Sequence, residues 1–214
     1  MFSDAVKRIQ SERGSRAAYA KVEANHGFNV DIDDDLREFL AGIDTAFLAT
    51  SDASGQPYIQ HRGGPKGFIR VLDDHTLAFV DYAGNRQYIS TGNLIENAKV
   101  CLFLIDYAHR QRVKVWGTAR MVPATPELLE RITAAIAPSS PIDAQPTVPS
   151  SPIAKRARTE QVCLITVSRW DVNCPQHIPV KLDAQDVALA VDKLQARIVE
   201  LEAENAALRQ HLIR

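Results

Sequence analysis

Three basic clusters, well separated along the chain, carry the side chains best suited to holding an anion. In the first, residues 60–68 read Gln-His-Arg-Gly-Gly-Pro-Lys-Gly-Phe, so that His61, Arg62 and Lys66 flank a run of glycines. Glycine lets backbone N–H groups approach a ligand closely, and arginine and lysine supply charge for a phosphate. The pattern matches neither a Walker A loop nor a dinucleotide fingerprint. A glycine-rich hairpin turn with solvated basic residues would have the same sequence.

The second cluster, residues 81–88, joins a predicted strand to a short predicted helix. We expect Asn85 to cap this helix and Arg86 to lie in its first turn. A helix N-terminus beside an arginine is a ready anion site. An ordinary capped helix with a surface arginine fits the spacing equally well.

The third cluster, residues 109–114, opens the next strand with three cations in a few residues. Alone, it is typical of a solvated hairpin end. Near the end of the chain, residues 170–177 read Trp-Asp-Val-Asn-Cys-Pro-Gln-His. One cysteine and one histidine, Cys174 and His177, fall short of a zinc site, so we predict no metal.

The elements that must position these clusters are mainly short strands. We expect one helix over residues 2–24 and another beginning at Asp33, both packing on the main domain as residues 1–44. From Thr45 the hydrophobic period changes to that of strands, with tight turns and one interposed helix that ends near Ala98. The predicted fold class is therefore mainly β with flanking helices, an α+β fold built on a small antiparallel closed or split barrel over residues 45–180. Within it, residues 137–155 are rich in proline and serine and are expected to be a mobile loop.

The C-terminal segment, residues 181–214, has the clearest periodicity in the sequence. Its apolar seam has alternating spacings of 4 and 3, and consists of Val187, Val191, Leu194, Ile198, Leu201, Asn205, Leu208 and Leu212. This heptad pattern predicts a parallel coiled coil of two chains. Asn205 lies at an a position, where a buried amide would favour a parallel, in-register dimer. Arg197 would face Glu202 of the partner, and Glu204 would face Arg209. An amphipathic helix lying on its own barrel is the alternative.

The composition narrows the class of protein. The chain has 25 basic and 26 acidic side chains among 214 residues, so it lacks the overall field expected of a nucleic-acid-binding or membrane-surface protein. No stretch approaches the roughly 20 apolar residues of a membrane span, and the charged N-terminus does not resemble a signal peptide. Cys101 and Cys163 lie in apolar runs rather than in a disulfide framework. We therefore expect a cytoplasmic protein with no membrane and no nucleic-acid partner.

Taken in order, these segments resemble the FMN-binding split barrel of pyridoxamine 5′-phosphate oxidase-like proteins. The resemblance is carried by residues 61–68, 76–106 and 110–120, together with the closing strand and the Asn-Cys-Pro-Gln-His-Ile segment at 173–178. It implies that FMN lies at a homodimer interface, with Arg112 reaching the flavin bound to the partner subunit. The residues implied around FMN are His61, Arg62, Gly63, Gly64, Lys66, Val80, Asp81, Asn85, Arg86, Gln87, Gln111, Arg112, Asn173, Gln176 and His177.

One departure from the family pattern limits what the resemblance implies. The oxidase itself has Arg-Lys in the phosphate loop, where this chain has Arg86-Gln87, and its C-terminal pyridoxal phosphate pattern is not recognisable here. We therefore do not predict vitamin B6 oxidation. The expected function is that of an oxidoreductase in which FMN passes hydride or electrons from a small-molecule donor to an acceptor. The alternatives are a non-catalytic flavin-binding or flavin-sensing module, and a split barrel that binds a deazaflavin or haem.

Overall fold

The computed structural model describes residues 2–25, 27–134 and 158–212. Its elements, in chain order, are α1 (Asp4–Glu12), α2 (Arg16–Ala24), α3 (Asp34–Gly42), β1 (Thr45–Ser51), β2 (Pro57–Gly63), β3 (Arg70–Asp73), β4 (Thr76–Tyr82), α4 (Ile89–Glu96), β5 (Lys99–Asp106), β6 (Gln111–Pro123), α5 (Pro126–Ala134), β7 (Thr159–Val172) and α6 (Ala184–Leu212). The proline- and serine-rich stretch expected at 137–155 lies outside the described residues.

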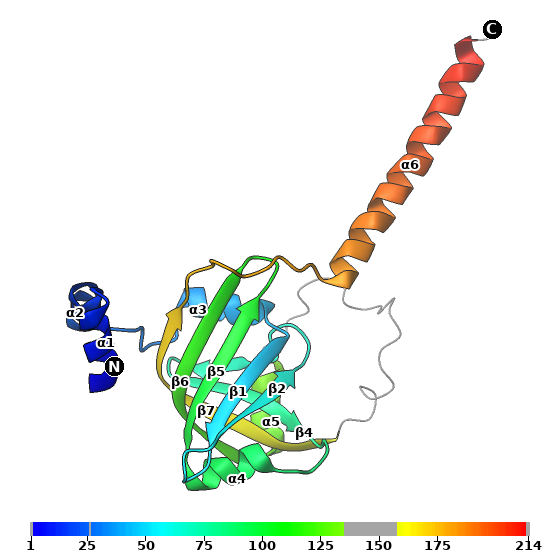
Figure 1. Cartoon of the computed structure of the whole chain (residues 1–214). Helices are drawn as coiled ribbons and strands as arrows, with labels where there is room; N and C mark the ends of the chain where they lie inside the picture. Colours follow the sequence, from blue (N-terminus) through cyan, green and yellow to red (C-terminus); the bar gives the residue numbers. More distant parts are fainter. Residues whose placement is uncertain (1, 26, 135–157, 213–214) are drawn as a thin grey trace.

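The strands form a single antiparallel sheet in the order β2-β1-β5-β6-β7-β4-β3. The sheet curls on itself into an open barrel, with β2 and β3 as its two edges in the described part of the chain (Figure 1). The late strand β7 pairs with both β6 and β4, so it joins the two halves of the sheet across the segment that precedes it. The α+β fold and the split barrel expected from the sequence are confirmed.

The barrel interior is filled by side chains that alternate along each strand. On β1, Ala46 and Leu48 are buried inside while Phe47 faces outward, as the period of two in a strand requires. The same alternation buries Val113 and Val115 of β6. At Gly117, where the β6–β7 register shifts, a Cβ atom would lie 2.0 Å from the carbonyl oxygen of Thr166, so only glycine fits there.

The N-terminal helices differ in part from expectation. The single helix predicted over residues 2–24 is wrong, because the chain breaks at Gly14, which has a φ of 78°, and restarts as α2 at Arg16. The helix expected from Asp33 is confirmed as α3, and the Asp33 side chain caps it by accepting a hydrogen bond from the Leu36 N–H at 3.0 Å. Helix α3 closes one end of the barrel with Leu36 and Leu40, each 1% exposed.

The predicted C-terminal helix is present as α6, which projects away from the barrel as a single rod (Figure 1). Its seam is exposed: 65% at Leu194, 54% at Ile198 and 62% at Leu208. An ion pair of 3.7 Å between Lys66 and Asp186 links its first turn to the loop after β2. The alternative of a helix lying along its own barrel is not what this structure has, and the apolar seam is left without cover in one chain.

Candidate functional site

A polar cavity of about 240 Å³, here called the β2–α4 pocket, opens where β2, the end of β4 and the start of α4 meet. Its walls come from four separate parts of the chain, including the start of β7. The lining residues are Tyr58, Gln60, Arg62, Asp81, Tyr82, Gly84, Asn85, Arg86, Gln87, Tyr88, Ile89, Ser90, Thr91 and Glu160.

The edge strand β2 supplies one wall through simple alternation. Tyr58, Gln60 and Arg62 lie two residues apart and are the half-buried positions of the strand, whereas Ile59 and His61 face outward. The Tyr58 hydroxyl donates to Gln60 Oε1 at 2.5 Å, which fixes both side chains. The strand therefore presents a row of polar groups to the pocket.

Arg62 is held in the pocket by an ion pair but keeps an unused donor. Its Nη1 donates to Asp81 Oδ1 at 2.5 Å, and Asp81 is only 8% exposed. The other Asp81 oxygen accepts from Gln161 Nε2 at 2.9 Å, and the same Gln161 nitrogen lies 3.1 Å from Thr91 Oγ1. Arg62 Nε is buried without a partner among the described residues. A buried, unpaired N–H of a guanidinium costs free energy, so this site favours a ligand that can accept a hydrogen bond.

The loop before α4 leaves the helix N-terminus open. The prediction that Asn85 caps the helix is wrong. Its Oδ1 accepts a hydrogen bond from the Gln87 N–H at 3.2 Å, which closes a local turn three residues before the N-cap position of α4. The N-cap residue is instead Tyr88, which has a φ of 53° and makes no side-chain cap hydrogen bond. The first-turn N–H groups of α4 therefore face the pocket without an acceptor from a cap.

Two side chains add donors to this open helix end. Ser90, in the first turn of α4, is 4% exposed, and its Oγ has no partner among the described residues. Arg86 is exposed and lies in the loop with a φ of 59°, a left-handed conformation that is costly for arginine. Strained, non-glycine positions of this kind are concentrated at ligand-binding sites.

The charges of the pocket balance within one chain. Arg62 and Arg86 are offset by Asp81 and by Glu160, which accepts a hydrogen bond from the Tyr88 hydroxyl at 2.7 Å. That hydrogen bond raises the pKa of Tyr88, because ionised Tyr88 would lose the bond and face the carboxylate. One chain thus offers many hydrogen-bond donors but no net positive charge to an anion.

Five other residues expected around FMN, on β2, in the loop after it and on β4, lie outside this pocket. His61 is on the outer face of β2, with its ring centroid 5.7 Å from that of Phe47. Val80 points away from Asp81 and packs against the small cluster under α5. Gly63 ends β2, Gly64 donates its N–H to the Asp44 carbonyl, and Lys66 is paired with Asp186.

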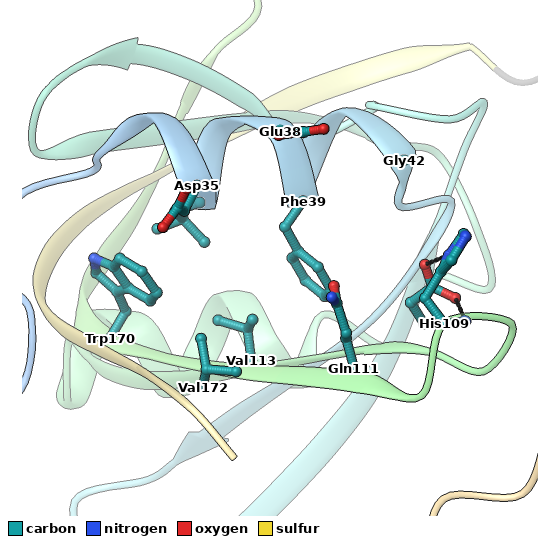
Figure 2. Close-up of a pocket in the computed structure, with 11 residues that line it drawn as sticks. Asp35, Glu38, Phe39, Gly42, His109, Gln111, Val113, Trp170 and Val172 are labelled. Carbon is teal, nitrogen blue, oxygen red and sulfur yellow. Dashed lines mark hydrogen bonds and ion pairs between the residues drawn. The ribbon is translucent and has the colours of Figure 1, made fainter. Parts of the chain in front are cut away.

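The other five expected residues gather at the opposite end of β6 and β7. Gln111 lines a second, larger cavity of about 510 Å³, here called the α3 pocket, which is shown in Figure 2. Next to it, the Asn173 N–H donates to the Arg112 carbonyl at 3.0 Å, while Arg112 Nε and Asn173 Oδ1 are buried without partners in the described chain. Gln176 and His177 follow in an exposed turn, with a φ of 65° at His177. The α3 pocket is lined by Asp35, Leu36, Glu38, Phe39, Gly42, Asp106, His109, Gln111, Val113, Trp170 and Val172.

One chain thus divides the expected residues between two ends of the barrel. Glu160 of β7 lines the β2–α4 pocket, whereas Trp170 and Val172 of the same strand line the α3 pocket. Arg62, Asp81, Asn85, Arg86 and Gln87 come together, and Gln111, Arg112, Asn173, Gln176 and His177 do not join them.

Sequence reasoning missed several residues of the β2–α4 pocket. Tyr58 and Gln60 had a usable signal, since they share the strand face of Arg62. Ser90 and Glu160 had none, because the start of α4 and the pairing of β7 with β4 depend on contacts distant in sequence.

These features define a split barrel with a polar, donor-rich pocket at one end. The family model described as pyridoxamine 5′-phosphate oxidase matches residues 32–174, which is more than half of the 214 residues. The chain belongs to the pyridoxamine 5′-phosphate oxidase-like family. No curated protein matches the chain.

Several solved structures have a similar fold, and they belong to proteins that are described in different ways. An FMN-binding protein from Syntrophomonas wolfei is 14% identical, with 74% of this chain and 96% of that chain covered and a TM-score of 0.46. HupZ from group A Streptococcus is 18% identical, with 71% and 99% covered and a TM-score of 0.46. The haem storage protein HutZ from Vibrio cholerae is 16% identical, with 66% and 94% covered and a TM-score of 0.42. Values this low do not indicate which ligand this chain binds.

Among the described residues, no helix combines the length and the apolar character needed to cross a bilayer.

Proposed function

We propose that this chain is an FMN-binding flavoprotein that works as an oxidoreductase, with the FMN phosphate in the β2–α4 pocket. The observation that carries the proposal is a set of donors without acceptors: the uncapped N-terminus of α4, the buried Ser90 Oγ and the buried Arg62 Nε. A phosphate monoester supplies acceptor oxygens for all three kinds of donor. The residues present therefore fit the group.

In this proposal the protein residues bind and orient the cofactor. Arg86 and the first turn of α4 hold the phosphate, and Arg62, fixed by Asp81, holds the adjoining part of the ligand. FMN, when bound, supplies an isoalloxazine that accepts hydride or electrons from a small-molecule donor and passes them to an acceptor. Gln60 and Tyr58 lie on the same face of β2 as Arg62 and line the pocket beside it.

A second copy of the chain supplies what one chain lacks. The balanced charge of the β2–α4 pocket leaves a phosphate dianion without a net counter-charge. At the far end of the barrel, Arg112 has a buried Nε that no described residue of its own chain pairs with. In a twofold dimer with the chains side by side in opposite directions, that end of the partner approaches the β2–α4 pocket. The outer face of β1, β2 and β5 is suited to such an interface, since Phe47 and Phe103 lie in paired register there and Ile59 is 64% exposed.

The exposed seam of α6 supports a second contact in the same homodimer. In a parallel coiled coil, Leu194, Ile198 and Leu201 are covered by the partner helix. Asn205, whose Nδ2 donates to the Leu201 carbonyl at 3.0 Å, lies in the seam, where a buried amide fixes register. Burying the seam removes an apolar stripe from water, which is the main stabilising contribution to such a dimer.

The test is the spectrum of the purified full-length protein, with mass spectrometry of whatever it releases on denaturation. We expect flavin absorbance and FMN in the released fraction, or a saturable flavin spectrum after FMN is added to the colourless protein. Release of a deazaflavin or of haem, with no FMN binding on titration, would overturn the cofactor assignment. Bleaching of the flavin by NADH or NADPH, with reoxidation by air, separates an oxidoreductase from a module that only binds or senses flavin.

A further inference from the structure

The α3 pocket is a built cavity that the proposed flavin site does not use. It lies between α3 and the β5–β6 hairpin, and its volume of about 510 Å³ is in the range of small-molecule sites. Its inner wall is apolar and buried: Leu36 is 1% exposed, and Val113 and Trp170 are each 2% exposed. In Figure 2, Phe39 projects from α3 into the space between this helix and the strands β6 and β7. Its ring offers an aromatic surface to a flat ligand.

The charged groups that line this cavity are acidic. Asp35 projects from α3 towards Trp170, whereas Glu38 lies on the upper side of α3, away from the strands (Figure 2), and both side chains are exposed. Neither carboxylate has a hydrogen bond or an ion pair with any residue that the structure describes. No lysine or arginine is among the lining residues. Of the nearby cations, Arg37 pairs with Asp74 at 2.7 Å and Lys181 lies over the Tyr107 ring, so neither offsets these acids.

The hairpin side of the cavity also presents acceptors. His109 Nδ1 lies 2.7 Å from Asp106 Oδ2, and the His109 N–H donates to Asp106 Oδ1 at 2.9 Å. In the tautomer of His109 that donates its Nδ1–H to this carboxylate, Nε2 is left as an acceptor. Burial opposes ionisation of Asp106, but the hydrogen bonds from His109 outweigh it and lower the pKa of Asp106. The Trp170 N–H is not available to a ligand, because it donates to the Asp31 carbonyl at 2.8 Å.

We infer that the α3 pocket binds a small organic cation, an amine or protonated nitrogen heterocycle that also carries a flat apolar group. The carboxylates and His109 accept hydrogen bonds from the cation, and the half-buried ring of Phe39 contacts its flat apolar group. Anions are disfavoured, since the lining has acidic groups and no cationic side chain other than histidine. The inference does not require FMN in the β2–α4 pocket, with which the α3 pocket shares no residue of the same chain; Gln111, which the family resemblance implies around FMN, lines the α3 pocket.

The experiment uses three probes of similar shape and different charge: phenethylamine, 2-phenylethanol and phenylacetate. The chain has two tryptophans, and only Trp170 lines the α3 pocket, so the two indole N–H signals in an ¹H–¹⁵N spectrum of the full-length protein report on it separately. The Trp116→Phe variant assigns the signals. We expect phenethylamine to shift the Trp170 signal with saturation, and phenylacetate to leave it unchanged at the same concentrations.

Two neighbouring acids provide a matched pair of variants. Asp35→Asn removes a lining carboxylate and should weaken phenethylamine about 3- to 10-fold, as expected for one partly solvated charge at contact distance. Asp34→Asn, in the same helix turn, removes an exposed acid that does not line the cavity and should leave the affinity unchanged. Equal binding of phenylacetate, no saturable shift of Trp170, or equal effects of the two variants would each overturn the inference. Arg86→Gly should bind phenethylamine as the wild type does, whatever happens to flavin.

Discussion

Arg86 allows the phosphate proposal to be tested without disturbing the fold. The residue is exposed, lines the β2–α4 pocket and has a φ of 59°. Glycine adopts this conformation without strain, so Arg86→Gly removes the guanidinium and also relieves about 1–2 kcal/mol of backbone strain. The greater freedom of glycine in the unfolded chain costs about 0.5–1 kcal/mol. The two effects partly offset, so the unfolding free energy of the cofactor-free protein should stay the same or rise by up to about 1.5 kcal/mol.

The loss in cofactor binding is expected to be much larger. A charge-assisted hydrogen bond contributes about 1.5–3 kcal/mol. Because each 1.4 kcal/mol is a tenfold change in affinity, Kd for FMN should rise about 10- to 150-fold. Titration of the cofactor-free protein with FMN, followed by quenching of flavin fluorescence, measures Kd directly. Riboflavin, which lacks the phosphate, should bind the variant and the wild type equally well.

Two control variants separate the phosphate contact from general electrostatics. Arg86→Lys keeps the charge but loses the paired donors, and should fall between the wild type and the glycine variant. Arg120→Ala changes the net charge by the same unit at an exposed position of β6 outside the pocket, and should leave Kd unchanged. The reasoning is refuted if Arg86→Gly keeps wild-type affinity for FMN, or if FMN and riboflavin lose affinity equally.

Three further outcomes follow from other parts of the chain. Deletion of residues 184–214 should weaken the dimer in sedimentation experiments while FMN still binds, and an unchanged dimer constant would refute the coiled coil. The pKa of Asp106 is lowered in the folded protein, so its ionised carboxylate stabilises the fold above its unfolded pKa of about 3.9, and this contribution is lost as pH falls through the folded pKa. Asp106→Asn should therefore be less stable than the wild type in urea at about pH 7. The difference in stability should shrink below about pH 4. Burial raises the pKa of Cys163 to about 12, so a maleimide at pH 8 should label exposed Cys174 in the native protein and reach Cys163 only in denaturant, as mass spectrometry can show.

Local patterns in the sequence predicted the elements well. The change to a strand from Thr45 and the helix beginning at Asp33 each depend on residues close in sequence, and both predictions are confirmed by β1 and α3. The break at Gly14 also had a local signal, since a glycine beside a serine favours a turn, but the prediction of one helix over residues 2–24 overrode it.

The composition of the site could be predicted only in part, because its contacts are not local. Arg62 and Asp81 lie on different strands, and Gln161, which holds Asp81 in place, reaches it through the β4–β7 pairing. No short pattern contains that pairing. The start of α4 was placed too early because Asn85 is a favourable cap residue, whereas the structure closes a turn at Asn85 and begins the helix after Tyr88.

The proposal that two chains share each flavin site leads to a prediction that a single-chain site cannot produce. Arg86→Gly removes the phosphate contact of one chain, and Arg112→Ala removes the arginine that the partner would lend, so each homodimer should bind FMN weakly at both sites. A mixed dimer of the two variants contains one site with both defects and one with neither. Co-expression with two affinity tags isolates this mixed dimer, and we expect it to bind one FMN per dimer with wild-type affinity. Suppose instead that each site were built from the Arg86 and Arg112 of one chain. Every site of the mixed dimer would then lack one of the two arginines, and its affinity for FMN would stay low. Restored binding at one site per dimer therefore requires that Arg86 and Arg112 act on the same FMN from different chains.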